Sequence, residues 1–580
     1  MKRATILVFF ALTSALWAQK VEVREETLSN GMRLLIVERH DSPTIACGWV
    51  ARVGSVNEHP GITGISHLFE HMMFKGTKTI GTTDFTKGQE IRNQQDAVFA
   101  EMREEYSKLR KKLRLGEISG SIYDQDNQTP RLKELRAQLE KLFAEEKKYI
   151  VKDELDKIYT GAGGAGLNAF TTEDQTTYFI TLPSNKLELW FWLESDRLLN
   201  PVFREFYSER DVVREERRMR VESTPTGRLD ELFNAMFWES APYSWPVIGW
   251  ASDVEAITRK QAEDYFGIYY APNNITAILV GDVDPDKALA MAEEYFGRIP
   301  RGKVAPPEMI TVEVGQAAQK RTTGEADTNP TVTFRYHTPP FDHKDTFPLE
   351  ILAEALNGRT GRLYKSLVEE KQVAVGQPGA RLTTNKYGGF LELSAEVKDG
   401  HTHQEVEDAM LGELQKLKTE PMQDHELQKL KNNELADSFR RLQTNFYLLL
   451  QLIIYDSSGD WHYINDSSPK LLAVTAGDIQ RVADEYLKEE NQSVAWYERK
   501  EGGEPEDPEL AAMPAQVRQR VKQQISFIQK ETDVQKLQQV LAQMQQMAGQ
   551  LPPESKPAIE YLIKKTQARI DELSTSEGGN

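Results

Sequence analysis

Cysteine is almost absent from this chain of 580 residues. Its one cysteine, Cys47, excludes an intrachain disulfide and any metal cluster built on thiolates. An excess of positive charge is also absent, because 71 lysines and arginines face 89 aspartates and glutamates, and the formal net charge is −18. This balance argues against a protein that binds nucleic-acid backbones and against a polybasic membrane-surface protein. Histidines and carboxylates must therefore carry any metal chemistry.

Long apolar runs are lacking beyond the N-terminus. Residues 1–18 begin with Lys2 and Arg3 and continue into an apolar run that is too short to span a bilayer, which is typical of a signal peptide. We expect cleavage after Ala18, with an uncleaved anchor as the alternative. The sequence predicts an exported protein, periplasmic in a Gram-negative cell and secreted otherwise, with no integral membrane segment after signal removal.

Two successive blocks of the chain repeat the same order of strand and helix patterns. The length predicts several domains, and we expect one over residues 22–250 and a homologous one over 260–498. The first opens with two strand-forming runs around Asn30-Gly31, a strong hairpin signal. The predicted fold class is α+β: two homologous α/β domains, each with an antiparallel sheet flanked by helices.

Two further segments are predicted to be helical. Residues 85–158 are charge-dense with apolar residues at helical spacing, and Thr129-Pro130 supplies a cap followed by proline at the first helical position. We expect a helical-hairpin insertion there, and a helical extension over 509–580. A coiled-coil adaptor is a weaker alternative, because neither segment sustains a strict heptad.

The sharpest chemical signal is His67-Leu68-Phe69-Glu70-His71. Positions i and i+4 share one helical face, so both imidazoles can reach a single ion, and the Glu70 carboxylate can stand beside it. Imidazole nitrogens suit Zn²⁺, and a catalytic zinc site needs a third protein ligand and an open position. The alternative is an ordinary buried helix with two hydrogen-bonded histidines.

A carboxylate on another helix is the expected third ligand. In the segment 208–217, Glu209 and Glu216 are seven residues apart and share a face, whereas Glu215 points about 100° away from Glu216. Glu216 could coordinate while Glu209 orients a ligand or accepts a proton. Taken alone, this stretch would be an ordinary exposed helix.

Together with GAGLNAFTTEDQTTYF at 164–179, these motifs resemble the pitrilysin/insulinase family of zinc peptidases, the inverzincins, and are similar to its bacterial members of the mitochondrial-processing-peptidase type. The run 168–182 favours a β-strand. The resemblance implies a Zn²⁺ site at His67, His71 and Glu216. It also implies that Glu70 activates water and that Glu209 assists. Asn168 and Ala169 would be the family's Asn-Ala pair on a strand edge that binds peptide by β-augmentation. Without the resemblance, Asn168 would be interpreted as a turn or strand-start residue.

This sequence departs from the family pattern in two places. The 144 residues between His71 and Glu216 exceed the usual family spacing, and the helical insertion accounts for the excess. Family active sites also receive an Arg and a Tyr from a second domain, and Val368 and Val375 occupy those places here. Valine cannot donate a hydrogen bond to an oxyanion.

The sequence therefore predicts the zinc-bearing half of a metalloendopeptidase that cleaves peptides or small unfolded proteins. A homologous peptidase-like subunit would supply the Arg/Tyr pair, in a hetero-oligomer or in a homodimer. The alternative is a non-catalytic peptide-binding or assembly subunit on a peptidase-like scaffold.

Overall fold

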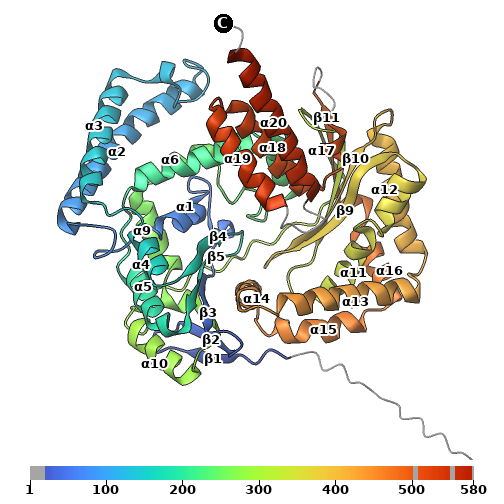
Figure 1. Ribbon diagram of the computed structural model, residues 1–580, viewed down its shortest axis with the longest axis horizontal. Helices are drawn as coiled ribbons and strands as arrows, with labels where there is room; N and C mark the ends of the chain where they lie inside the picture. The colour runs from blue at the N-terminus through green and yellow to red at the C-terminus, as the bar shows by residue number, and fades with distance from the viewer. Residues whose placement is uncertain (1–19, 501–506, 549–555, 578–580) are drawn as a thin grey trace, which may run out of the picture.

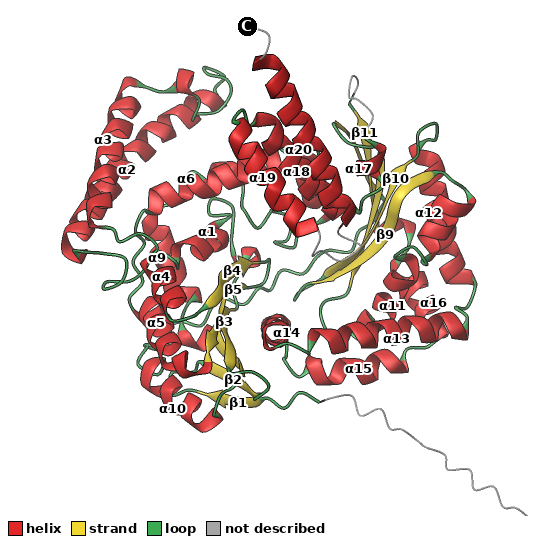
Figure 2. Ribbon diagram, in the orientation of Figure 1, coloured by secondary structure: helices red, strands yellow, loops and turns green. Residues whose placement is uncertain are grey.

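The computed structural model describes residues 20–500, 507–548 and 556–577, and within them two β-sheets are each flanked by helices (Figure 1 and Figure 2). The predicted α+β class is confirmed. The expected signal peptide, 1–18, lies outside the described residues. None of the helices in the described part combines the length and the apolar character that a membrane span requires.

The first sheet has six strands in the order β1-β2-β6-β3-β5-β4. Their bounds are β1 Arg24–Thr27, β2 Arg33–Glu38, β3 Thr44–Ala51, β4 Ala165–Thr171, β5 Thr176–Pro183 and β6 Ile275–Gly281. Strands β1 and β2 form the antiparallel hairpin expected around Asn30-Gly31, where Gly31 adopts a φ of 90°. The run 168–182 was expected to be one strand, but residues 172–175 turn the chain and divide it into β4 and β5.

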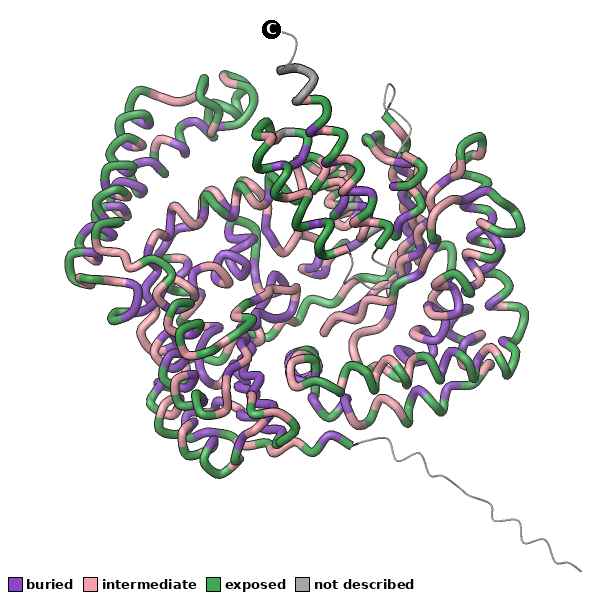
Figure 3. The backbone as a smooth tube through the Cα atoms, viewed as in Figure 1, coloured by how far each residue is buried: buried purple, intermediate pink, exposed green. Residues whose placement is uncertain are grey.

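The central strands β2, β3 and β6 of the first sheet are buried on both faces and read as nearly continuous apolar runs, whereas the edge strands β1 and β4 are more exposed (Figure 3). In β2, Leu34 and Ile36 join one core, while the alternating Leu35 and Val37 join another on the opposite face. The helices of this half are α1 Ile65–Met72, α2 Phe85–Arg114, α3 Pro130–Glu146, α4 Glu154–Gly161, α5 Leu187–Leu199, α6 Phe206–Arg217, α7 Gly227–Phe237, α8 Ala251–Val254, α9 Arg259–Tyr269 and α10 Pro285–Tyr295.

The second sheet repeats five strands of the first in the order β7-β11-β8-β10-β9. Its bounds are β7 Lys320–Ala326, β8 Thr331–Thr338, β9 Ala374–Thr384, β10 Gly389–Val397 and β11 Gln492–Arg499, and its helices are α11 Thr346–Leu356, α12 His403–Thr419, α13 Asp424–Arg441, α14 Asn445–Ser458, α15 Tyr463–Ala473 and α16 Ala476–Tyr486. In each sheet the last strand along the chain enters parallel to the first strand of the repeat and antiparallel to the second. Both sheets are therefore mixed, whereas antiparallel sheets were expected.

The two halves share segments across the expected boundary between residues 250 and 260. Strand β6 lies beyond that boundary, yet it pairs with β2 and β3 in the first sheet. Helix α14 lies still later in the chain, and its Leu448, Leu452 and Ile453 cover a face of the first sheet. Hydrogen-bond pairing and burial thus tie late segments of the chain to the first half.

Helices α2 and α3 pack against each other as the predicted hairpin, and the Thr129 side chain caps α3 with Pro130 at its first position. The C-terminal helices have a core of their own, which includes Leu537 and Tyr561. They are α17 Pro508–Ala511, α18 Ala515–Lys530, α19 Val534–Ala548 and α20 Lys556–Glu577. Arg518 of α18 pairs with Glu396 of β10 and so docks this bundle on the second half.

Candidate metal centre

Helix α1 is anchored at its start by a carboxylate from outside the helix. Gly64 precedes it in the left-handed region, with a φ of 89°, and has no side chain with which to cap the helix. Glu58 replaces that cap, because its two carboxylate oxygens accept the N–H groups of Gly64 at 2.7 Å and of Ser66 at 2.8 Å. Buried Leu68 and Phe69 fasten the helix to the core. The sequence HLFEH therefore sits on a rigid helix.

The two histidines of α1 face Glu216 at the end of α6. One donor atom from each of His67, His71 and Glu216 lies within 4.8 Å of the others. Nε2 of His71 is 3.4 Å from Oε2 of Glu216, and Nε2 of His67 is 3.7 Å from Oε1. In a tetrahedral zinc site with bonds of about 2.0–2.1 Å, ligand atoms lie about 3.3 Å apart. The separations and the two-nitrogen, one-oxygen donor set therefore fit Zn²⁺.

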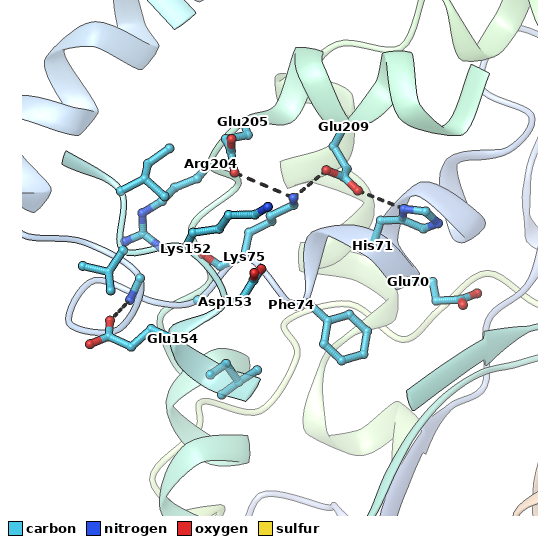
Figure 4. Close-up of a pocket in the computed structure, with 15 residues that line it drawn as sticks. Glu70, His71, Phe74, Lys75, Lys152, Asp153, Glu154, Arg204, Glu205 and Glu209 are labelled. Atoms are coloured by element: carbon cyan, nitrogen blue, oxygen red, sulfur yellow. Dashed lines mark hydrogen bonds and ion pairs between the residues drawn. The ribbon is translucent and has the colours of Figure 1, made fainter. Parts of the chain in front are cut away.

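Glu209 lies seven residues before Glu216 on the same face of α6, and it contacts the other nitrogen of His71. Its Oε1 lies 3.0 Å from Nδ1 of that imidazole, which leaves Nε2 directed at Glu216. Its second oxygen pairs with Lys75 at 2.5 Å. Figure 4 shows this chain from Lys75 through Glu209 to His71. Nδ1 of His67, by contrast, is buried without a hydrogen-bond partner in the described part of the chain.

Glu70 stands beside the three-residue cluster without belonging to it. Its carboxylate is half-buried, and Oε2 accepts a hydrogen bond of 2.7 Å from the Thr171 hydroxyl of β4. A carboxylate in this position lies near the ion site but leaves the three donors to their own cluster. This is the arrangement that a general base requires.

Burial and charge act differently on the titrating groups of the centre. Burial lowers the pKa of His67, and the charge of the Glu216 carboxylate opposes part of that effect. Burial also opposes the charged form of His71, but the Glu209 and Glu216 carboxylates outweigh it and raise the pKa of His71 to about 9. Burial raises the pKa of Glu70, and the Thr171 hydrogen bond offsets part of that effect.

Asn168 and Ala169 lie on β4, which is the edge strand of the first sheet. They pair with Phe179 and Tyr178 of β5 on one side, and no described strand pairs with β4 on the other. The exposed Asn168 side chain accepts the N–H of Ala169 at 2.9 Å. Because α1 packs against β4, this open edge runs beside the histidine helix.

A cavity of about 270 Å³ adjoins the centre on the side of Glu70 and His71. The end of α1, the segment that returns from the helical hairpin and the start of α6 line it together; the side chains include Phe74, Lys75, Ile150, Lys152, Arg204 and Glu205 (Figure 4). Apolar and charged side chains thus meet next to the candidate ion site.

Three contributors to the centre were not identified from the sequence. Lys75 and Arg220 pair with Glu209 and Glu216, and Thr171 binds Glu70. Arg220 lies four residues after Glu216 on the same helical path, which was a usable signal. Thr171 is distant in sequence from Glu70, and no local pattern could have linked the two.

Comparison with known families identifies the class of protein. Residues 33–102 and 137–249 match the family described as insulinase (peptidase family M16), and residues 256–434 match the M16 inactive domain. The chain belongs to the M16 family, the insulinase/pitrilysin family, as its motifs predicted. The match is interrupted only over 103–136, so the outer part of the α2–α3 hairpin is what the family pattern lacks.

Individual relatives agree with this assignment. The zinc protease PqqE of Helicobacter pylori is 26% identical over 495 residues, which cover 83% of this chain and 95% of the relative. A crystal structure of a protease from Helicobacter pylori superposes with a TM-score of 0.67 at 24% identity and covers 83% of this chain and all of that one, 100%. The periplasmic protease PqqL of Escherichia coli gives a TM-score of 0.62 at 17% identity over 83% of this chain and 48% of its own.

Proposed function

We propose that this protein is a zinc-dependent endopeptidase that cleaves peptides or small unfolded proteins. The observation that carries the proposal is the convergence of donor atoms from His67, His71 and Glu216 within 4.8 Å of one another. Membership of a peptidase family, and relatives that are named zinc proteases, support the same function. These three residues would hold the zinc ion.

Bound zinc supplies a Lewis acid that polarises the scissile carbonyl and acidifies a water molecule. Glu70 takes the proton from the attacking water, for which its half-buried carboxylate beside the histidines is suitably placed. Glu209 keeps Nδ1 of His71 engaged, so that Nε2 faces the ion site. Lys75 in turn holds Glu209.

The substrate would bind as an additional strand on the open edge of β4. Asn168 and Ala169 lie on this edge, which passes α1 and its Glu70. An extended peptide that pairs with β4 is thereby directed toward the ion site. Unfolded segments meet this requirement, because their backbone hydrogen-bonding groups are free.

A homologous subunit would complete the site with an Arg and a Tyr. In this chain the corresponding places hold Val368, which packs partly buried against the second core, and Val375, which lies on β9. Neither side chain can stabilise an oxyanion. The partner is a second, related chain in our proposal, and a homodimer is the alternative.

We also propose that the protein works outside the cytoplasm, in the periplasm of a Gram-negative cell. The basic start and apolar run of residues 1–18 support export. The structural neighbour PqqL is described as a periplasmic protease.

The decisive experiment compares the wild-type chain with Glu70→Gln, each assayed alone and with its homologous partner on an unstructured peptide. We expect equal zinc content by elemental analysis and a loss of turnover of at least about 10²-fold in the variant, which is the contribution of a positioned general base. Unchanged turnover in Glu70→Gln would overturn the mechanism.

A non-catalytic peptide-binding or assembly subunit is the second candidate. Two observations favour it: the second half matches a family domain described as inactive, and Val368 and Val375 replace the Arg/Tyr pair. Such a subunit would bind peptide but stay inactive both alone and with the partner. The assay above separates the two functions.

A further inference from the structure

We propose that Thr171 is a positioning residue that aims the Glu70 carboxylate for the proton transfer. This inference rests on the proposed peptidase function and deepens it. It concerns Thr171, which lies within the motif at 164–179 but to which the sequence assigned no role.

The contact is specific in its geometry. The Thr171 hydroxyl donates to Oε2 of Glu70 at 2.7 Å, and in the described part of the chain it is the one hydrogen-bond donor to that carboxylate. A hydrogen bond from a hydroxyl to a carboxylate is stronger than a neutral one. With Oε2 held, Oε1 is the oxygen left free to accept a proton from water. Without the hydroxyl, the side chain of Glu70 regains rotameric freedom that the reaction would have to restrict.

Thr171 lies on the strand that is proposed to bind peptide, and its hydroxyl contacts the proposed general base. It is the last residue of β4, on the same edge strand as Asn168 and Ala169, and it pairs with Thr176 of β5. A peptide that adds to this edge would therefore lie on the strand that also holds the Glu70 carboxylate.

Neighbouring threonines have different tasks. The Thr176 hydroxyl donates to the carbonyl of Val53, and the Thr172 hydroxyl accepts the N–H of Asp174 within the turn. These contacts fasten the strand ends to the protein backbone. The Thr171 hydroxyl instead donates to Glu70, the side chain proposed to accept the proton.

The test compares Thr171→Val, which keeps the shape and removes the hydroxyl, with Thr171→Ser, which keeps the hydroxyl. Thr177→Val is the matched control, because the Thr177 hydroxyl is buried on β5 with no hydrogen-bond partner among the described residues. Each variant is made in the full chain, assembled with its partner, and assayed for kcat, KM, zinc content and thermal unfolding.

We expect kcat of Thr171→Val to fall about 10- to 100-fold, the effect of one hydrogen bond to a charged group, with KM within about twofold. Zinc content and unfolding temperature should match the wild type, Thr171→Ser should recover kcat to within about threefold, and Thr177→Val should leave kcat unchanged.

Wild-type kcat in Thr171→Val, a change confined to KM, or loss of zinc from that variant would each overturn the proposal while leaving the peptidase function intact. If Thr171→Val does not fold, Thr171→Ala takes its place, and wild-type kcat in that variant overturns the proposal equally. A wild-type enzyme without zinc-dependent turnover is a different result, since it removes the proposed function and this inference together.

Discussion

The two halves of the chain share one topology but place different side chains on equivalent helices. Helix α1 follows β3 and packs against the edge strand β4, while α11 follows β8 and packs against the edge strand β9. On α1, His67 and His71 face Glu216; on α11, residues such as Leu349 and Leu352 are fully buried in the second core. The shared scaffold therefore does not define the site. A few polar side chains on one of its two copies define it.

The largest expected effect breaks the metal centre itself. Glu216→Ala removes one of three converging donors, and we expect loss of bound zinc and at least about a thousandfold loss of turnover, since a metal ion supplies several kcal/mol to the transition state. Elemental analysis and peptide hydrolysis measure both. The matched control in the second half is Glu354→Ala on α11, which should retain zinc and activity. Zinc retained by Glu216→Ala would show that the donor set is wrong.

A core substitution in the second half tests whether its helix is purely structural. Leu352→Ala deletes a fully buried side chain of α11, so we expect the free energy of unfolding to fall by about 2–5 kcal/mol. Urea unfolding measures the change. Zinc content per folded molecule should remain at the wild-type value, and a specific loss of zinc would mean that α11 supports the metal centre directly.

A smaller effect is expected from the residue that orients His71. Glu209→Gln weakens the 3.0 Å contact to Nδ1, and we expect zinc affinity to fall about 10- to 100-fold, as for other residues that orient metal ligands. Competition with a chelator measures this. Glu205→Gln is the control, because Glu205 contacts Lys75 at 3.7 Å and leaves the His71 contact in place. Equal affinities in the two variants would contradict the role of Glu209.

Local patterns predicted the parts of the site that follow helical spacing. His67 and His71 lie four residues apart, and Glu209 and Glu216 lie seven apart, so each pair shares a face before any fold is known. The family resemblance then joined the two helices across 144 residues, and the structure brings their donors together.

Tertiary pairing could not be predicted in the same way. The turn at 172–175 contains no Gly, Pro or Asn, and Asp174 is its one common turn residue, so the run into β5 was interpreted as one strand. Whether β6 enters parallel or antiparallel depends on crossovers far away in the chain, and the contact between Thr171 and Glu70 depends on the packing of α1 against β4. These features follow from long-range geometry that no window of sequence contains.

The placement of α14 has a consequence for how the chain matures. Strand β6 completes the first sheet at Gly281, but α14, which covers the sheet face opposite α1, begins only at Asn445. A nascent chain therefore completes the first sheet long before α14 can cover the apolar face of that sheet, and we expect a fragment that ends between these two points to aggregate or to bind a chaperone. Folding of the first half thus depends on a helix from the second half of the chain.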